Sequence, residues 1–299
     1  MNTFDKKNVR EIVCPICNSK NNKFYCSKNS YNLFECLNCD LVFVYPVPGN
    51  LGDIYGKEYF RNIKQKGNFG YVDYEQDKKS MRGVFELYLQ KLEKITAERK
   101  IFDVGAATGY FLDIAKERGW QTSGSEISVY AAEVAKKKGH KIFTGSLKKM
   151  KTEEKYDSVT MWDVLEHLDN PKEYLRAVNR ILKKGGVVAI NTIDKHSLWA
   201  KLWGKNWHLI VPPEHLYYYS RKNLSMLLTD CGFGINEMEK IGKRFSLAYI
   251  FKILHNWHHL AIWYKLSCYF EKYFWRKFAL PVNLRDNIFI IANKIKDVD

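Results

Sequence analysis

The sequence predicts a doubly wound α/β fold with a mainly parallel sheet, and three observations lead to it. A β-branched and aromatic run at 101–104 ends in Asp103-x-Gly105-x-x-x-Gly109, and an amphipathic helix follows at once. From Lys100 onward, strand-like and helix-like segments alternate, which is typical of βαβ units. The chain has 299 residues, of which 46% are hydrophobic, so a large core can be buried.

The elements of the sheet domain follow in order. Seven strands are expected, at 101–104, 121–125, 141–144, 158–162, 187–193, 235–241 and 288–295. The helix after the fourth strand should begin at Pro171, with Asp169 or Asn170 as its N-cap. Ser220 should cap a further helix that closes at Gly232.

Two more elements are expected before the sheet. Leu41–Pro48 has the composition of a strand that prolines stop. A helix is expected from about Asp77 to Thr96, because its apolar positions recur at helical spacing; they are Val84, Leu87, Tyr88, Leu92 and Ile95.

The N-terminal region carries the spacing of a metal module. Cys14-Pro-Ile-Cys17 and Cys36-Leu-Asn-Cys39 are two Cys-x-x-Cys pairs with 18 residues between them. Two such pairs close a tetrahedral shell of four thiolates, which is typical of a zinc ribbon. Because a closed four-cysteine shell has no open position, we expect the Zn²⁺ to be structural. Cys26, between the pairs, is interpreted as an ordinary thiol.

The bulk composition limits the protein's location and partners. The net charge of +15 favours an anionic partner, such as nucleic acid, a phosphorylated substrate or an anionic membrane, although many of the lysines fit scattered helix surfaces. The polar start, Met1 to Arg10, is unlike a secretory signal, and there is no run of 18 apolar residues. We therefore expect a cytoplasmic protein without a membrane span.

The loop at 103–109 indicates a ligand of a particular kind. Gly105 and Gly109 allow a tight turn and a close backbone approach, and the first turn of the next helix offers unpaired N–H groups. A dinucleotide loop needs Gly-x-Gly-x-x-Gly, but here the series reads Gly105, Ala107, Tyr110. Asp103 would also repel a diphosphate, whereas it would attract the ammonium of a methionine. The segment resembles the cofactor loop of class I S-adenosylmethionine (SAM)-dependent methyltransferases, although Ala107 stands where glycine is more usual.

This resemblance implies a Rossmann-like, seven-stranded methyltransferase sheet and a cofactor site along it. Glu126 ends the second strand, where a carboxylate suits the two hydroxyls of the adenosine ribose. Gly145-Ser146-Leu147 resembles the place that holds the adenine ring. The residues expected to bind SAM are Asp103, Gly105, Ala106, Gly109, Tyr110, Phe111, Glu126, Ile127, Ser146, Leu147, Trp162, Asp163 and Val164.

Two histidines are candidates for the chemistry. A hydroxyl or carbon nucleophile needs a base, and ligands of such sheets bind at the carboxyl ends of the strands, where His167 and His215 are expected. His215 is favoured, since Glu214 adjoins it and two prolines precede it. This stretch resembles the Glu-His pair of sugar C-methyltransferases with a similar zinc module, whose long C-terminal domain is absent here. This difference counts against C-methylation, whereas a saccharide-like acceptor stays compatible with the motif.

The resemblance also suggests how the chain is divided. We expect a zinc ribbon at 1–48, a helical lead-in or lid at 49–97 and the SAM-dependent domain at 98–299. Such a lead-in commonly covers the cofactor, and its lid candidates are Tyr55, Tyr59, Tyr71 and Tyr74. An aromatic insert at about 243–285 is interpreted as a helical pair packed on the core or on a second subunit. The alternative is a basic aromatic surface for an anionic membrane or a lipid-linked glycan.

Three functions are compatible with these features. The leading hypothesis is an O-methyltransferase acting on a saccharide or a related small metabolite, with an acceptor that is a small molecule or an anionic or lipid-linked glycan. The second is a zinc-ribbon RNA base methyltransferase, which the basic charge suggests. The third is a non-catalytic cofactor-binding scaffold, against which the intact Asp103, Gly105 and Glu126 argue.

Overall fold

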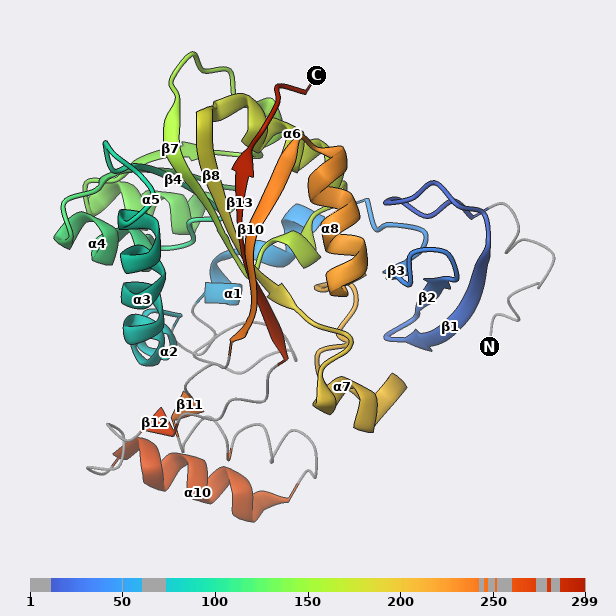
Figure 1. Ribbon diagram of the computed structural model, residues 1–299. Coiled ribbons are helices and arrows are strands. Elements are labelled where there is room, and N and C mark those ends of the chain that lie inside the picture. Colours follow the sequence, from blue (N-terminus) through green and yellow to red (C-terminus); the bar gives the residue numbers. More distant parts are fainter. Residues whose placement is uncertain are drawn as a thin grey trace.

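The computed structural model describes residues 12–49, 51–60, 74–241, 245–246, 251, 260–272, 279–280 and 286–298. Within these ranges the chain forms a central sheet with helices on both faces and a small N-terminal sheet beside it (Figure 1). The lid candidate Tyr71 and much of the aromatic insert lie outside the described residues. No helix among the described residues is long and apolar enough to cross a membrane.

The central sheet has seven strands in the order β10-β13-β8-β7-β4-β5-β6. Their bounds are β4 (Lys100–Val104), β5 (Gln121–Glu126), β6 (Lys141–Thr144), β7 (Tyr156–Trp162), β8 (Leu182–Ile193), β10 (Phe233–Ile241) and β13 (Asn287–Lys294). The pairs of β4 to β8 are parallel, and β13 runs antiparallel to both of its neighbours. All seven strands predicted from the sequence are confirmed, and the fold is the Rossmann-like sheet expected of a methyltransferase.

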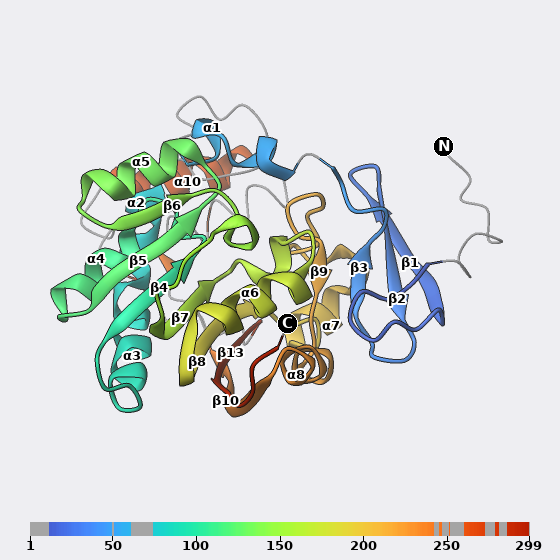
Figure 2. The ribbon, with the colours of Figure 1, turned by 90° about the horizontal axis from the view of Figure 1, so that it is seen from above.

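Alternating side chains of the strands build a core on each face of the sheet. Ile101 packs on one face in the cluster that includes α3 (Arg82–Glu93) and α4 (Tyr110–Glu117), and the adjoining α5 (Val129–Lys137) contributes Ala132 and Ala135. The next residue, Phe102, packs on the other face with α6 (Pro171–Ile181) and α8 (Arg221–Asp230). The two views show these two groups of helices on opposite sides of the sheet (Figures 1 and 2).

Both predicted helix starts on the second face are confirmed. The Asn170 side chain accepts a hydrogen bond from the backbone N–H of Glu173, with Pro171 at the first position of α6. Ser220 caps α8 in a capping box with Asn223. These caps satisfy N–H groups that a helix cannot satisfy itself.

The helix predicted over 77–96 is wrong in one respect, because it is broken. The structure has α2 (Tyr74–Lys78), a 3-10 turn η3 (Lys79–Met81) and then α3. Leu87 and Ile95 are exposed rather than inward, and the buried side chains of α3 are Val84, Phe85, Tyr88, Leu89 and Leu92. The break lets Lys78 turn inward toward the end of β7, where it lies 3.8 Å from the Asp163 carboxylate.

The N-terminal sheet includes one strand, β9, that comes from a much later part of the sequence. Its order is β1 (Asn22–Lys28), β2 (Tyr31–Cys36), β3 (Val42–Val44) and β9 (Tyr217–Tyr218). Of the strand predicted at 41–48, only Val42–Val44 is confirmed. Val42 and Phe43 pair with the two tyrosines of β9, which directly follow His215 and Leu216. The N-terminal sheet thus holds the loop that carries one of the candidate histidines.

Shorter elements surround the two sheets. They are η2 (Leu51–Tyr55), α1 (Lys57–Phe60), η4 (Leu147–Lys149), η5 (Leu165–His167), α7 (Leu198–Trp203), η6 (Gly204–Asn206), β11 (Phe245–Ser246), α10 (Ala261–Lys272) and β12 (Ala279–Leu280). In the described part of the insert, Phe251 is helical, α10 is a helix and β11 pairs with β12, and the rest of the segment in which a helical pair was expected lies outside the described residues. This part extends away from the central sheet (Figure 1).

Candidate functional site

The loop after β4 has three residues with positive φ angles, and two of them are glycines at which an added Cβ atom would clash with neighbouring side chains. Gly105 has φ 72°, and a Cβ atom there would lie 2.7 Å from Cγ2 of Val164. Ala107 also adopts a positive φ, 49°, which explains why glycine suits that position. Gly109 has φ 83°, and its neighbours are His140 and Ala135 of the adjoining helix. Packing within the protein and the positive φ angles therefore account for both glycines.

Two buried carboxylates flank this loop. Asp103 accepts a hydrogen bond of 2.6 Å from the Thr160 hydroxyl, and burial raises its pKa to about 8, with the nearby Glu126 adding to the rise. Glu126 accepts hydrogen bonds from the backbone N–H groups of Ala107 at 2.9 Å and Ser128 at 2.8 Å. Burial also raises the pKa of Glu126. A cationic ligand beside Asp103 would recover part of the cost of burying its charge.

The remaining residues expected to touch the cofactor fall into two groups. Ile127 is 42% exposed just beyond Glu126, and Ser146 donates a hydrogen bond of 2.7 Å to the Tyr174 hydroxyl. By contrast, the side chains of Phe111, Leu147 and Trp162 pack inside the protein. The Trp162 ring stacks on Tyr88 at 4.8 Å between centroids. For these three, cofactor contact stays a prediction.

A lysine that the sequence reasoning missed lies beside the end of β7. Lys78 is 9% exposed, and its ammonium lies 3.8 Å from Asp163 and 5.4 Å from the centre of the Tyr74 ring. Asp163 itself accepts a hydrogen bond of 2.5 Å from the Asn191 amide. The sequence gives little indication that Lys78 is buried, because two adjacent lysines, Lys78 and Lys79, are typical of a solvent-exposed helix face.

The two candidate histidines lie side by side. The ring centres of His167 and His215 are 4.7 Å apart, although 47 residues separate them in the sequence. His167 follows β7 on η5, and His215 is buried on the loop before β9. Nδ1 of His167 lies 2.7 Å from the Glu214 carbonyl oxygen, and Nδ1 of His215 lies 2.8 Å from that of Leu209.

The lead-in segment covers this histidine pair. The Tyr55 hydroxyl lies 3.1 Å from Nδ1 of His167, and the Tyr59 hydroxyl donates a hydrogen bond of 2.7 Å to the Glu214 carboxylate. The structure therefore brings Tyr55 and Tyr59 to the candidate catalytic residues. Tyr74 is one element further on and packs against Phe60.

A third ionisable side chain at this place was not singled out from the sequence. Glu166 is 1% exposed, accepts a hydrogen bond of 2.8 Å from the Thr192 hydroxyl, and offers a carboxylate oxygen near both histidines. Its backbone carbonyl accepts a bond from the N–H of Leu216. The only signal in the sequence is that Glu166 directly precedes His167.

The four cysteines of the N-terminal region come together as their spacing predicts. Sγ of Cys14 lies 3.5 Å from Sγ of Cys39, the same distance joins Cys17 and Cys36, and all four sulfurs lie within 4.8 Å of one another. A hydrogen bond with Cys14 and burial raise the pKa of Cys39, and burial raises that of Cys36. Around an ion with Zn–S bonds of about 2.3 Å, tetrahedral sulfurs lie about 3.8 Å apart, so the cluster fits Zn²⁺.

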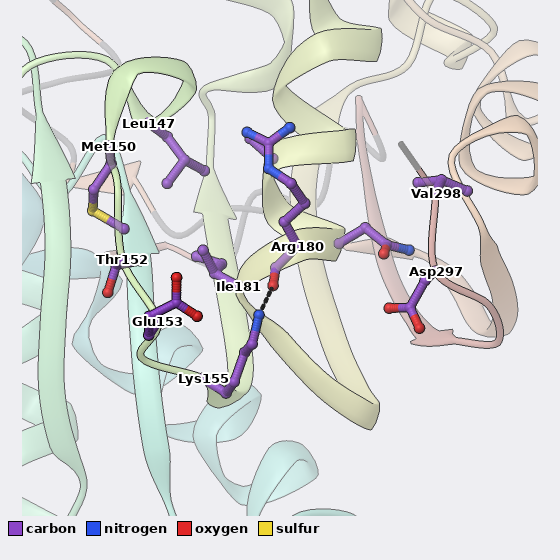
Figure 3. Close-up of a pocket in the computed structure, with 11 residues that line it drawn as sticks. Leu147, Met150, Thr152, Glu153, Lys155, Arg180, Ile181, Asp297 and Val298 are labelled. Atoms are coloured by element: carbon purple, nitrogen blue, oxygen red, sulfur yellow. Dashed lines mark hydrogen bonds between the residues drawn. The ribbon is translucent and has the colours of Figure 1, made fainter.

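A separate pocket of about 340 Å³ lies away from these groups (Figure 3). Its lining includes Leu147, Met150, Arg180 and Asp297. Apart from Leu147, it contains none of the residues discussed above. Two of its lining residues are joined by a hydrogen bond of 2.6 Å, which the Lys155 ammonium donates to the Arg180 carbonyl oxygen.

Comparison with known proteins places this geometry among methyltransferases. Residues 75–237 match the family described as a methyltransferase domain. A ubiquinone biosynthesis O-methyltransferase of Histophilus somni is 26% identical over 176 residues, covering 50% of this chain and 74% of that protein. Its counterpart from Dechloromonas aromatica is 28% identical over 137 residues, covering 42% of this chain and 58% of that protein. A SAM-dependent methyltransferase of Thermotoga maritima has the same fold, with a TM-score of 0.51 at 20% identity over 74% of this chain and 94% of its own.

Proposed function

The chain belongs to the methyltransferase-domain family and is a SAM-dependent methyltransferase, and from that premise we propose that it methylates a hydroxyl of a saccharide or a related small metabolite. The observation that carries the proposal is the pair of a partly buried His167 and a buried His215, whose rings lie side by side close to the end of strand β7. Relatives named ubiquinone biosynthesis O-methyltransferases support a hydroxyl acceptor.

The cofactor lies, in this proposal, along the loop between Asp103 and Glu126. The Asp103 carboxylate faces the methionine ammonium, and Glu126 accepts hydrogen bonds from the ribose hydroxyls. Each Glu126 oxygen already accepts one backbone N–H, and a carboxylate oxygen has room for a second donor. Because the methyl sulfonium is already activated, the protein's main task is to hold the acceptor oxygen in line with it.

The polar groups beyond β7 suit a polyhydroxylated acceptor. Glu214, Tyr55 and Tyr59 surround the histidine pair and can exchange hydrogen bonds with several hydroxyl groups. His215 acts on the reacting hydroxyl, either by taking its proton or by positioning it. Its ring is oriented by the contact of 2.8 Å between Nδ1 and the Leu209 carbonyl oxygen.

The four-cysteine cluster is proposed to hold one structural Zn²⁺ through Cys14, Cys17, Cys36 and Cys39. Four thiols at 3.5 Å within each pair cannot all ionise without a cation, because like charges at that distance repel strongly. Elemental analysis of protein purified without chelators should find one zinc per chain. A preparation that is folded and zinc-free would contradict this.

A methyl-transfer screen tests the function. Labelled SAM is offered with nucleotide sugars, glycans and RNA, and label is expected in a saccharide or small-metabolite fraction. The Glu126→Ala variant serves as the control that should lose cofactor binding, because it lacks two hydrogen bonds to the ribose. Transfer to RNA alone would assign the enzyme to RNA base methylation, which the charge of +15 would then explain. Cofactor binding without any transfer would support the scaffold alternative.

His215→Ala tests the role of the histidine. Cofactor affinity should stay close to that of the wild type, and turnover should fall by about a hundredfold or more, the usual scale for the loss of a general acid or base. Calorimetry with SAM and a steady-state assay separate the two effects. If the variant instead loses SAM binding, His215 has a structural role, and unchanged turnover would leave His167 as the acting group.

A further inference from the structure

Two helices at one end of the molecule turn apolar side chains toward solvent. On α7, Leu198 and Leu202 are 69% and 68% exposed, and on α10, Ile262 is 59% exposed. Exposed apolar clusters of this kind characteristically mark a surface that binds a partner or a membrane. We infer that α7 and α10 dock the protein on an anionic lipid bilayer. This docking does not rest on the proposed function.

Both helices leave the central sheet at the edge where the parallel strands end. Across β8, β13 and β10, Ile193 pairs with Asn287, and Asn287 pairs with Ile241 on its other side. The segment after Ile193 leads to α7, and the segment between Ile241 and Asn287 contains α10. Figure 1 shows the two helices at the same end of the molecule, below the sheet. They can therefore contact one surface together.

Helix α7 has the composition of a helix that lies in a membrane interface. Leu198 and Leu202 are four residues apart and share a face with Lys201, which is also exposed. Trp203 ends the helix and is 45% exposed, whereas Ala200 is buried and holds the helix to the protein. Leucine and tryptophan side chains enter the headgroup region of a bilayer, and a lysine ammonium stays at the level of the lipid phosphates.

Helix α10 packs inward by one face and presents an apolar residue with a lysine on another. On the inner face, the rings of Trp263 and Phe270 stack on Phe251 at 5.8 and 5.2 Å between centroids. Ile262 and Lys265 are both exposed, and three residues separate them, so they are neighbours on the outer face. This outer face therefore repeats the pattern of α7.

The charge of these segments fits an anionic surface. From Leu198 to Asn206 the sequence has two lysines and no acidic residue, and the insert at 243–285 has eight lysines and arginines against one acidic residue, Glu271. Each basic side chain near an anionic bilayer adds to the attraction. A second copy of the chain fits this surface less well, because a symmetric contact would place the same lysines against one another.

Vesicle flotation tests the inference on the full-length protein. At low salt, the wild type should float with vesicles of phosphatidylcholine that contain phosphatidylglycerol, and much less with vesicles of phosphatidylcholine alone. Binding should fall as salt is added, because salt screens surface charges. Lys201→Ala should weaken binding by about fivefold. Leu202→Ser and Ile262→Ser should each weaken it by about tenfold, the scale of removing one apolar side chain from contact with lipid.

Ile295→Ser is the matched control for Ile262→Ser. Ile295 is 63% exposed, but it follows the end of β13 at the opposite edge of the sheet, so this variant should bind vesicles like the wild type. Circular dichroism and SAM calorimetry check that each variant is folded.

Three results would overturn the inference. They are a wild type that does not float with anionic vesicles, equal binding to anionic and neutral vesicles, and equal loss of binding in Ile262→Ser and Ile295→Ser. Analytical ultracentrifugation adds a further check: dimers that Ile262→Ser dissociates, without vesicle binding, would assign the surface to a second copy. Because flotation needs no methyl acceptor, its outcome is independent of the methyl-transfer screen.

Discussion

At the scale of single residues, burial decides how the cofactor-side carboxylates behave. Asp103 and Glu126 are 2% and 5% exposed, and burial raises both pKa values. In the proposed cofactor site, the ammonium of SAM beside Asp103 would favour its ionised form. We therefore expect SAM binding to displace a proton from Asp103.

Asp103 should make cofactor binding depend on pH. Its pKa of about 8 lies above the ordinary value of 3.8, so below pH 8 the protonated form dominates and must lose its proton to face the ammonium. Affinity for SAM should therefore rise from pH 6 toward pH 8, by up to about tenfold per pH unit. Calorimetry across this range should also detect proton release on binding.

The matched control for this pH dependence is Asp103→Asn. Its side chain keeps the size of the carboxylate but cannot titrate, so its weaker affinity should be much flatter with pH. An unchanged pH profile in Asp103→Asn would place the titrating group elsewhere, with Glu126 as the next candidate.

At the scale of elements, the N-terminal sheet and the loop that carries His215 form one unit. β3 pairs with β9, and the Val44 N–H donates to the Leu216 carbonyl, one residue after His215. Across the same junction, Lys195 lies within 3.0 Å of Glu35 and 2.9 Å of Asp40. The cysteine cluster therefore supports the loop that positions His215, although its ligands are far from that loop in the sequence.

Cys14→Ser should consequently affect turnover more than cofactor binding. The change weakens metal binding, which is coupled to the local fold, and loosens the β3–β9 pairing that holds His215. SAM affinity should stay near the wild-type value, while turnover should fall by roughly tenfold to a hundredfold, as expected from a small displacement of a reacting group. Zinc content, calorimetry and kinetics measure these three effects.

Cys26→Ser is the control for this variant. Cys26 is also buried in the N-terminal sheet, but it lies outside the four-thiol cluster. It should keep its zinc and most of its turnover. Equal turnover in Cys14→Ser and the wild type would show that the two sheets function separately.

At the scale of the whole molecule, hydrogen bonds join three segments at the β10–β13 end of the central sheet: helix α6, the turn before β10 and the end of β13. The Asn179 amide of α6 donates to the carbonyls of Cys231 and Lys296, at 3.1 and 3.0 Å. Lys294 of β13 donates at 2.8 Å to the Asn179 carbonyl. Gly232 lies at this junction with φ 83°, and a Cβ atom there would lie 2.7 Å from the Lys296 carbonyl oxygen.

Gly232→Ala should therefore destabilise the whole domain. Gly185→Ala is the matched control, because Gly185 also has a positive φ, 75°, but has nothing within 4 Å of the added Cβ. The control should cost about 1 kcal/mol from backbone strain alone, and Gly232→Ala about 1–3 kcal/mol more from the displaced backbone. Urea unfolding monitored by fluorescence measures both, and equal losses would contradict the role of the junction.

The sequence by itself determined the seven strands, the helix start at Pro171, the helix cap at Ser220 and the grouping of four cysteines, whereas the structure chose Asn170 over Asp169 as the cap. These features depend on local chemistry: alternation of side chains, hydrogen bonds within a few residues, and the spacing of ligand pairs. Only the tertiary structure decided that His167 and His215 are neighbours, that Glu166 joins them, that Lys78 turns inward, and that β9 completes the N-terminal sheet. Each of these four features depends on contacts between segments that are far apart in the chain. Such contacts are set by the packing of the two sheets, and no local pattern in the sequence predicts them.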